Sequence, residues 1–597
     1  MCGLAGELTR GSAETMPRAQ AESIAELLVH RGPDDAGIWQ SPTCTLIHRR
    51  LSIQDLSPAG HQPMRSPCGR YRLVFNGEIY NYKTLRAQLE AEGETFVSTG
   101  DTEVLLRLLI REGASALPRL RGMFAFCLFD QERQSALLGR DPFGIKPLYL
   151  YRSSDQRLLF SSEVRALLRS GSIPRALNGE ALQHYLMFGC VPQLGTLVEG
   201  LNALPPGHLA HWSNGALTIE RFWQPRFGEE KGDTYGDLVE RTRTAVKESV
   251  EAHMVSDVPV GLFLSGGLDS SAILAASDQR LTSLSIGFEE EAFDESALAE
   301  QVAQRFGSDH RRLLLRRDRA WSRLPAFFDA LDQPSTDGFN TYCVSAEAAD
   351  AGLKVVMSGL GGDELFGGYP LFQTVPKLLA LRQRLGPAAW AASQLIRPIK
   401  RAKLQRFSDY LASPPGVPAA HRCMRTIFSA REASRLIQLW DLPAPSTPPL
   451  HEGLESAGLA DQIAWLETSS YMGAMLLRDS DALSMASSLE LRVPLVDVGL
   501  FEALAPIAAS ERLAQGKQLL RDAFPEVTSV LQDAPKRGFV IPFDQWLRSP
   551  AAGTALPQLD LKAAARRVDL RPWARQWGLL VLADWLERNM GIALQPG

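Results

Sequence analysis

The chain has 597 residues, a formal net charge of −5 and 45% hydrophobic residues, which is the composition of an ordinary globular protein. The length predicts two or three domains, and the weak negative charge gives no reason to expect nucleic acid or a membrane as a partner. The seven cysteines are scattered without a CxxC pair, and no hydrophobic run reaches the roughly 18 residues of a membrane span. We therefore expect a cytoplasmic protein in a reducing compartment.

The second residue is the first candidate catalytic group. Removal of Met1 would leave Cys2 with a thiol and a free α-amine. Such an amine has a pKa of about 8 and can act as the general base for its own thiol. Taken alone, Cys2 is more simply explained as a small buried residue near the start of the chain.

A predicted strand over 71–75 leads directly into Asn76 and Gly77. The side-chain amide of Asn76 and the backbone N–H of Gly77 could form an oxyanion hole. The alternative for an Asn-Gly pair is a type I′ hairpin turn. Charged residues that could hold a free amino acid by its ammonium and carboxylate groups are Glu78, Asp101 and Arg50.

Together these residues resemble the class II glutamine amidotransferase domain, whose nucleophile is N-terminal. The segments that carry the resemblance, over residues 2 to about 165, are 30–37, 48–53, 60–64, 76–81, 99–103, 122–126, 140–149 and 161–163. The resemblance implies an αββα sandwich (Ntn hydrolase fold) with Cys2 as nucleophile and Asn76 and Gly77 as oxyanion hole. The glutamine-binding residues that it implies are Arg50, Leu51, Ile53, Glu78 and Asp101.

We expect the glutaminase domain at 2–205, a linker at 206–235 and a second domain at 236–597. Within the linker, Trp212, Phe222 and Trp223 indicate a short packed pair of strands. A charged, glycine-rich stretch over 228–236 suggests the boundary.

The second domain opens on a hydrophobic strand over 258–264 that breaks at Ser265-Gly266-Gly267 and continues as a helix. Glycines let backbone N–H groups approach an anion, and a helix N-terminus adds positive charge. Asp269 and Ser270 follow at once, and a carboxylate beside a phosphate suggests Mg²⁺. A bare Ser-Gly-Gly could be an ordinary strand–helix turn, but the string over 265–270 resembles the loop of ATP pyrophosphatases, which cleave ATP to AMP and pyrophosphate.

Two further strand–loop–helix units have their strands at 281–288 and 353–357. Alternating strands and helices predict a doubly wound parallel sheet, whose ligands lie at the carboxyl ends of the strands. The third strand ends in a second glycine-rich loop, 358–369, so Asp363 and Asp269 could share Mg²⁺. The alternative for Asp363 is a helix N-cap.

Residues 370–470 are rich in Ala and Leu and are predicted to be helical, and we interpret the basic run 397–406 as a solvated helix face. Distinct motifs return at 477–497, 516–521 and 536–546. A lysine such as Lys517 could neutralise leaving pyrophosphate, although Lys517 and Lys536 taken singly could be surface lysines.

With these motifs nearly the whole chain resembles the glutamine-hydrolysing asparagine synthetases. The resemblance implies ATP and Mg²⁺ as cofactors, adenylation of a carboxylate, and ammonia that crosses an internal tunnel and displaces AMP. The ATP-binding residues that it implies are Phe263, Ser265, Gly266, Gly267, Asp269, Ser270, Ile286, Ser358 and Gly359. It implies Lys517 as the residue that stabilises the leaving group, Asp269 and Asp363 as metal ligands, and is compatible with a homodimer.

One position departs from the family pattern. Asparagine-forming members usually carry an acid between the glycines of the second glycine-rich loop, where this chain has Leu360, and 337–340 departs from a Ser-x-x-Pro pattern. Both changes lie where the acceptor is expected. The acceptor is therefore either aspartate or another carboxylate, such as a uronic acid, a peptide or another metabolite.

A different class of function also has to be weighed. A bare glutaminase, or a scaffold with an inactive synthetase half, is disfavoured because Asp269, Asp363 and Lys517 are intact. A β-lactam-forming relative would not need Cys2.

Overall fold

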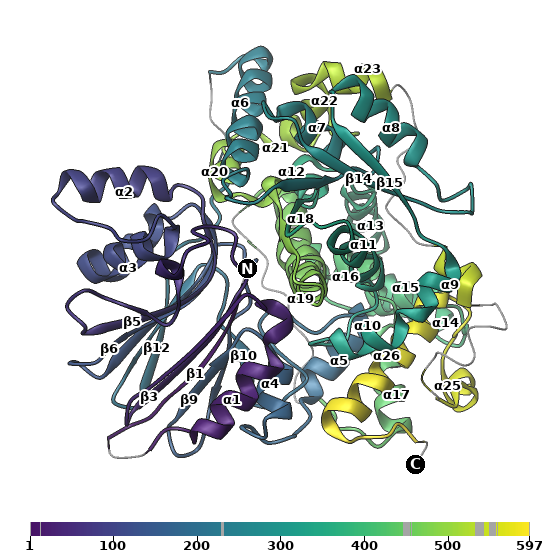
Figure 1. Cartoon of the computed structure of the whole chain (residues 1–597). Coiled ribbons are helices and arrows are strands. Elements are labelled where there is room, and N and C mark those ends of the chain that lie inside the picture. Colours follow the sequence, from purple (N-terminus) through teal and green to yellow (C-terminus); the bar gives the residue numbers. More distant parts are fainter. Residues whose placement is uncertain are drawn as a thin grey trace.

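The computed structural model describes residues 2–11, 14–228, 232–445, 454, 457–531, 542–547, 557 and 559–595. The N-terminal half contains two stacked antiparallel sheets (Figure 1). In spatial order the first consists of β10 (Leu201–Ala203), β8 (Tyr149–Arg152), β9 (Leu158–Ser161), β1 (Cys2–Leu8), β3 (Cys44–Arg50) and β2 (Asp35–Gln40). The second consists of β12 (Ala216–Arg221), β11 (His208–Ser213), β7 (Ser135–Arg140), β6 (Gly122–Asp130), β5 (Tyr71–Ile79) and β4 (Met64–Arg65).

Helices cover the outer face of each sheet. Helices α1 (Arg18–Leu27) and α4 (Val164–Arg169) lie on the first sheet, and α2 (Tyr82–Ala91) and α3 (Asp101–Glu112) lie on the second (Figure 1). Hydrophobic side chains of β1, β3, β6 and β7 fill the space between the sheets. This arrangement confirms the predicted αββα sandwich, since each sheet is hydrophobic on both faces.

Part of the predicted linker belongs to this sandwich. Strands β11 and β12 pair with each other, and β11 pairs with β7, so they extend the second sheet. The expected packed strand pair is therefore present, but the stretch 206–221 is an edge of the sheet and does not act as a linker.

The C-terminal half is built on a five-stranded parallel sheet. Its order is β15 (Asp309–Leu314), β14 (Thr282–Gly287), β13 (Val260–Phe263), β16 (Val355–Met357) and β17 (Glu490–Arg492). This confirms the doubly wound sheet, and the order of the strands reverses between β13 and β16, the position at which such sheets bind ligands. The sequence did not predict β15, a largely exposed polar edge strand, or the three-residue strand β17.

Helices surround this sheet and extend it into a separate lobe. The helices nearest the sheet are α6 (Tyr235–His253), α7 (Leu268–Ala276), α8 (Ser296–Arg305), α11 (Phe339–Asp350), α12 (Gly362–Phe366), α19 (Leu477–Met485), α20 (Val498–Leu504), α22 (Gln518–Ala523) and α23 (Pro525–Leu531). The lobe contains α13 (Leu371–Leu385), α14 (Ala388–Ile396), α15 (Ala402–Ala412) and α16 (Val417–Arg425). The remaining helices are α5 (Gly179–Phe188), α9 (Arg317–Ser322), α10 (Leu324–Ala330), α17 (Ala430–Leu439), α18 (Leu459–Leu466), α21 (Ala509–Arg512), α24 (Phe543–Leu547), α25 (Leu561–Arg567) and α26 (Trp573–Met590).

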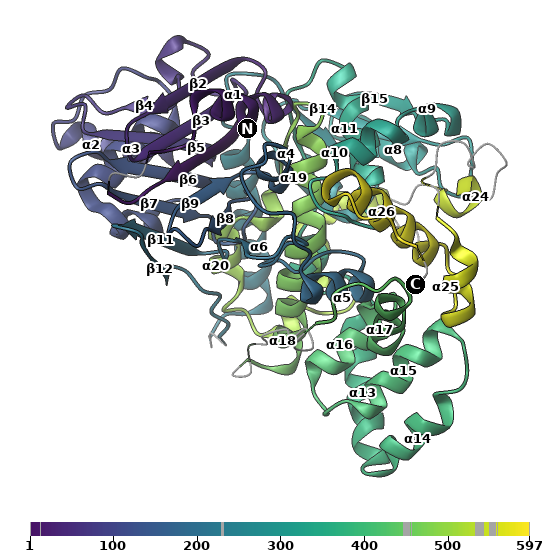
Figure 2. The ribbon, with the colours of Figure 1, turned by 90° about the horizontal axis from the view of Figure 1, so that it is seen from below.

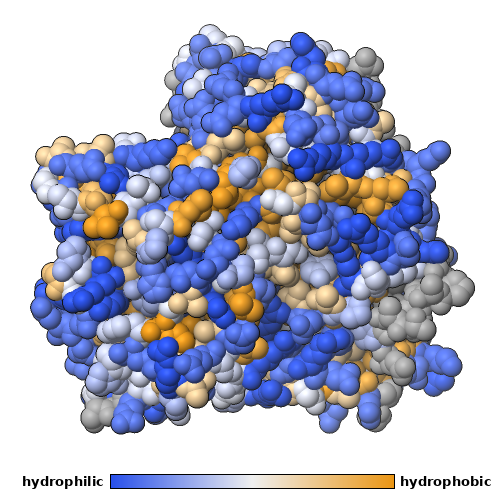
Figure 3. Space-filling view, in the orientation of Figure 1, coloured by the Kyte–Doolittle hydropathy of each residue, from blue (hydrophilic) through white to orange (hydrophobic). Residues whose placement is uncertain are grey.

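The two halves share their hydrophobic cores. One cluster joins Leu51, Ile53 and Met123 of the sandwich to Leu495 and Leu500 of the other half. On the face in Figure 3, hydrophobic residues gather in the hollow between the two halves. In the described ranges, no helix combines the length and hydrophobicity needed to cross a bilayer.

Candidate active sites

Cys2 is held at the start of β1 in the middle of the first sheet. It lies opposite Arg50 in the β1–β3 register, and only 7% of its surface is exposed. Its backbone N–H donates to Oδ1 of Asn76 over 2.9 Å. Burial raises the pKa of the thiol, while the amino terminus, the N–H of Leu51 and the charge of Arg50 act in the opposite direction. Cys2 therefore needs a general base to become a thiolate at neutral pH.

Asn76 and Gly77 lie inside β5, so the hairpin-turn alternative is excluded. The amide nitrogen Nδ2 of Asn76 is buried and has no hydrogen-bond partner in the part of the chain that the structure describes. A Cβ atom at Gly77 would lie 2.0 Å from the carbonyl oxygen of Met123, at a φ of 152°, so only glycine fits. A buried donor without a partner beside Cys2 is the arrangement that a developing oxyanion would complete.

Arg50 lies close enough to Cys2 for its charge to act on the thiol. Its guanidinium donates to the carbonyl oxygens of Ser57 and Gln54, both at 3.1 Å, and to that of Asp55. These acceptors are neutral and fix the side chain without cancelling its charge. Arg50 can therefore still attract a carboxylate.

Buried acids also lie near Cys2. Glu78 lies 3.5 Å from the guanidinium of Arg492, and Asp101 accepts a hydrogen bond of 2.8 Å from the N–H of Ile79. Burial and the nearby Glu490 raise the pKa of Glu78 well above its ordinary value. Burial alone would also raise the pKa of Glu490, but the positive charges of the amino terminus and Arg492 lower it to about 2.

Two of these residues come from the synthetase half and were not predicted for the glutamine site. Glu490 and Arg492 both lie in β17 and are fully buried. Their segment was recognised as part of the synthetase motif, but only the packing of the two halves places it against Glu78. Carboxyl groups outnumber guanidinium groups here, and their oxygens can accept hydrogen bonds from the α-ammonium group of an amino acid.

Asp101 predicts a pH dependence for glutamine use. Burial raises the pKa of Asp101 to about 6, and the hydrogen bond from Ile79 offsets only part of this shift. If Asp101 binds the ammonium group of glutamine, protonation below that pH removes the attracting charge. We expect KM for glutamine to rise about tenfold for each pH unit below 6. Asp101→Asn keeps an oxygen that can accept the hydrogen bond from Ile79 but carries no charge at any pH. Its KM for glutamine should therefore be high and should not rise further below pH 6. An unchanged rise below pH 6 in steady-state kinetics of that variant would contradict the assignment.

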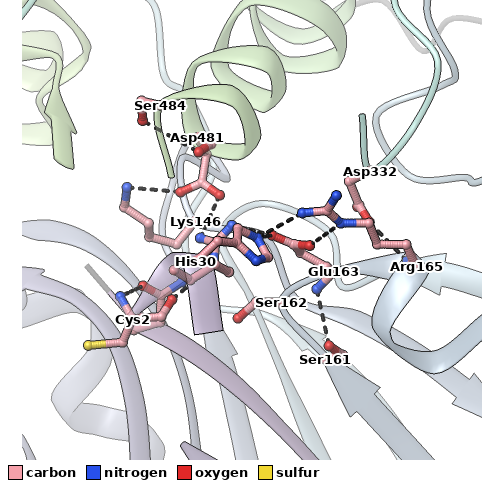
Figure 4. A network of polar contacts seen from close by, with 12 residues as sticks. Cys2, His30, Lys146, Ser161, Ser162, Glu163, Arg165, Asp332, Asp481 and Ser484 are labelled. Atoms are coloured by element: carbon pink, nitrogen blue, oxygen red, sulfur yellow. Dashed lines mark hydrogen bonds and ion pairs between the residues drawn. The ribbon is translucent and has the colours of Figure 1, made fainter. Parts of the chain in front are cut away.

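A buried ion network joins Cys2 to the synthetase half (Figure 4). The carbonyl oxygen of Cys2 accepts a hydrogen bond of 3.1 Å from Nε of Arg31. Arg31 forms ion pairs with Asp481 of α19 at 2.7 Å and with Glu163 at 3.2 Å. Lys146 reaches the second oxygen of Asp481 at 3.2 Å. The thiol points away from the network in Figure 4, which leaves it free for substrate. Helix α19 therefore supports the backbone of Cys2 through Arg31.

Asp481→Asn tests this support. The amide keeps the size of the side chain but removes the charge that balances Arg31 and Lys146. We expect kcat/KM for glutamine to fall about 10–100-fold, because small displacements of a reacting group have costs of this size. Glutamate formed per AMP should also rise above one. Lys354→Gln is the matched control, since the exposed Lys354–Asp34 pair also joins the two halves. Equal kinetics for Asp481→Asn and wild type would contradict the role.

The first glycine-rich loop has the geometry of an anion cradle. Gly266 adopts a φ of 70°, and Gly267 precedes α7 as its N-cap residue. The hydroxyl groups of Ser265 and Ser270 lie 3.2 Å apart across the loop. Asp269 lies in the first turn of α7. The loop thus places backbone N–H groups, two hydroxyls and a helix N-terminus around one point.

The second glycine-rich loop packs directly against the first. A Cβ atom at Gly359 would lie 2.9 Å from the backbone nitrogen of Ser270, and one at Gly362 would lie 2.4 Å from Oδ1 of Asp269. Glycine is needed at both positions because the loops touch. The predicted convergence of the two loops is therefore present.

Lys517 connects the two loops through their carboxylates. Its Nζ lies 2.5 Å from Oδ2 of Asp269 and 2.6 Å from Oδ1 of Asp363. Burial would lower the pKa of Lys517, but the two carboxylates raise it. Lys517 also adopts a left-handed φ of 59°, which is uncommon outside glycine and typical of functional positions. The N-cap residue of α12 is Gly361, so Asp363 is not the N-cap that the sequence also allowed. Lys517 is buried, so it is not a surface lysine.

The other predicted nucleotide residues surround these loops. Phe263 ends β13, Ile286 lies on β14, and Ser358 follows β16. The N–H of Ser358 donates to the carbonyl oxygen of Arg492 over 2.9 Å, which ties this loop to β17. Lys536 lies outside the described residues.

Leu360 is half-buried and packs against two hydrophobic clusters. It therefore supplies no charge to the neighbouring site. Asp337 is followed by Gly338, whose Cβ would collide with Leu483 at 2.1 Å. Burial raises the pKa of Asp337.

Two separate sites in one packed chain define an amidotransferase with its own ligase half. The glutamine amidotransferase domain family matches residues 1–223, and the asparagine synthase family matches residues 241–572. The chain belongs to the family of glutamine-hydrolysing asparagine synthetases. It is 31% identical to asparagine synthetase [glutamine-hydrolyzing] 1 of Bacillus subtilis, over 92% of this chain and 88% of that protein.

Two other relatives span similar lengths under different names. A putative asparagine synthetase of Mycobacterium bovis is 32% identical, over 92% of this chain and 89% of that protein. The amidase chry2 of Gibberella zeae is 27% identical, over 96% of this chain and 93% of that protein.

Proposed function

We propose that this enzyme uses ATP to adenylate a carboxylate and amidates it with ammonia released from glutamine. The observation that carries the proposal is the Asp269–Lys517–Asp363 bridge between two glycine-rich loops, in the same chain as the Cys2 pocket. Aspartate is the first candidate acceptor, with asparagine as product. Cys2 then acts as nucleophile in a domain that ends after β12, and the ligase domain begins at α6.

At the first site Cys2 attacks the side-chain carbonyl of glutamine. Removal of Met1 frees its α-amine, which takes the proton of the thiol and passes it to the leaving ammonia. Nδ2 of Asn76 and the N–H of Gly77 stabilise the oxyanion. Water then cleaves the glutamyl thioester to give glutamate and the free thiol. Arg50 holds the α-carboxylate of glutamine, and Glu78 and Asp101 hold its ammonium group.

At the second site the loops hold ATP while the acceptor carboxylate attacks the α-phosphorus and pyrophosphate leaves. Lys517 neutralises charge on the leaving pyrophosphate. Two carboxylates are enough for Mg²⁺, which binds proteins through one or two carboxylates together with substrate phosphates. Asp269 and Asp363 would hold that ion, which supplies further charge neutralisation. Ammonia finally attacks the acyl adenylate and releases AMP and the amide.

The packing between the sites supports transfer of ammonia within the protein. The side chains of Leu51, Ile53 and Met123 lie in one hydrophobic cluster with Met472 and Val493 of the synthetase half. Nonpolar walls favour neutral ammonia over protonated ammonium and exclude bulk water. We also propose that the enzyme is cytoplasmic. A homodimer is expected, and sedimentation analysis would test it.

The second candidate is the same chemistry on another carboxylate. Leu360 favours it, because a leucine in contact with hydrophobic clusters cannot pair with the ammonium group of aspartate. Relatives named as amidases also share the full-length architecture.

The test is a product balance. Purified enzyme is incubated with Mg-ATP and glutamine, with and without aspartate, and glutamate, AMP and asparagine are quantified. Asparagine formed in step with AMP supports the first candidate. If glutamate is released but aspartate does not stimulate AMP formation, the second candidate is supported. A screen of carboxylates for pyrophosphate release then follows. Absence of ATP–pyrophosphate exchange with every carboxylate would reject ligase function.

A further inference from the structure

Helix α14 lies in the lobe farthest from the strands of the N-terminal half (Figure 2). Its four exposed residues are all nonpolar: Ala388, Trp390, Ala391 and Leu395. The exposed fraction is 62% for Trp390 and 80% for Leu395. A surface helix normally turns a polar face to water, and α14 departs from this pattern.

The packing of the lobe fixes this orientation. Ala389 is completely buried in the core of the lobe. The polar residue Ser393 also faces inward, where its hydroxyl donates to the carbonyl oxygen of Trp390 over 2.6 Å. The hydroxyl of Ser408 on α15 donates to the carbonyl oxygen of Ser393 over 2.9 Å. Turning α14 to cover Trp390 would break the hydrogen bond from Ser408 and expose Ala389, so the nonpolar face is a built feature of the lobe.

The segments before and after α14 carry positive charge. The stretch 365–408 contains five arginines and three lysines but no acidic residue, in a chain whose net charge is −5. Six of these eight residues are exposed: Lys377, Arg384, Arg397, Lys400, Arg401 and Lys403. The contacts that hold some of them use neutral acceptors. Arg397 donates to Oε1 of Gln394 over 3.2 Å, and Lys400 donates to the carbonyl oxygen of Arg566 over 3.1 Å. These contacts do not neutralise the charge of the six exposed residues, which together with the exposed face of α14 form the patch discussed below.

We propose that α14 and the basic residues around it dock the enzyme on an anionic phospholipid surface. An exposed nonpolar helix face flanked by Lys and Arg is the pattern of helices that lie in the plane of a membrane interface. Trp390 and Leu395 enter the boundary between headgroups and acyl chains, while the long basic side chains reach the phosphate groups. Interpreting 397–406 as a solvated helix face explains the basic residues but not the exposed nonpolar residues of α14. Docking on a membrane surface explains both.

Two other occupants fit less well. A second copy of the chain would bring two equally basic patches together, which like-charge repulsion opposes. A nucleic acid would use the basic residues but not the nonpolar helix face. The Cys2 pocket and the phosphate loop lie outside the lobe, so docking leaves both sites accessible.

The test is sedimentation of the full-length enzyme with vesicles. One set contains phosphatidylcholine alone, and the other contains about one third phosphatidylglycerol. We expect binding to the anionic vesicles at low salt and release at about 0.5 M salt. Trp390→Ser with Leu395→Ser, and separately Arg384→Glu with Arg401→Glu and Lys403→Glu, should each weaken binding at least about tenfold. Glutaminase activity should stay unchanged in both variants, which shows that they fold.

Ile219→Ser with Leu459→Ser is the matched control, because these residues are 48% and 42% exposed outside the patch. This control should bind vesicles as wild type does. Wild type that binds neither kind of vesicle, or both kinds equally, overturns the proposal. So does a dimer in solution that the Trp390 variant dissociates without any vesicle binding, or binding of DNA in place of vesicles.

Discussion

Replacing Cys2 by alanine is expected to abolish glutamine hydrolysis and leave ammonia-dependent amide formation intact. The variant removes the thiol that we propose as the nucleophile, so glutamate release should fall by at least about 10⁴-fold. The ligase half keeps its own site, because Lys517 bridges Asp269 and Asp363 within that half of the chain. Pyrophosphate release is measured with ammonium chloride in place of glutamine, using whichever carboxylate the product balance identifies.

Cys68→Ala is the control for this experiment, since Cys68 is an exposed free cysteine. It should retain both activities. If Cys2→Ala still hydrolysed glutamine, the nucleophile would have to be assigned elsewhere. If it lost the ammonia-dependent reaction as well, the two sites could not be treated as separate.

Replacing Lys517 by methionine is expected to stop adenylation. The change leaves Asp269 and Asp363 close together without the ammonium group that now separates them, and it removes the cation beside the leaving pyrophosphate. We expect ATP–pyrophosphate exchange to fall about 10²–10³-fold, the size of effect seen when one charge-stabilising group is lost from an active site. Basal glutaminase activity should remain, because Cys2 lies in the other half.

Lys83→Met serves as the matched control, because Lys83 is exposed on α2. Near wild-type exchange in Lys517→Met would contradict the role of Lys517. Restoration of exchange by Lys517→Arg would show that charge alone is sufficient, whereas a continued loss would show that the compact ammonium group is required.

The local structure at both candidate sites could be predicted from the sequence. A glycine-rich loop needs only neighbouring residues to form, so the string from Ser265 to Ser270 is enough to identify an anion cradle. The αββα sandwich and the parallel sheet were also predictable, since strand and helix patterns are local. The expected linker was wrong over 206–221, because an edge strand such as β12 has few buried residues to reveal it.

The dependence of the two halves on each other could be seen only in their packing. Arg31 and Asp481 are 450 residues apart in the chain yet form a buried ion pair, and Arg492 of β17 meets Glu78 of β5. No pattern of neighbouring residues predicts such pairs, because they depend on how two hydrophobic cores pack together. The polarity of α14 is a second example: its sequence is simply hydrophobic, and burial of Ala389 and Ser393 determines that Trp390 faces water. Residues close together in the chain thus specify the chemistry of each site, whereas contacts between distant segments specify the coupling of the sites and the surface that the enzyme exposes.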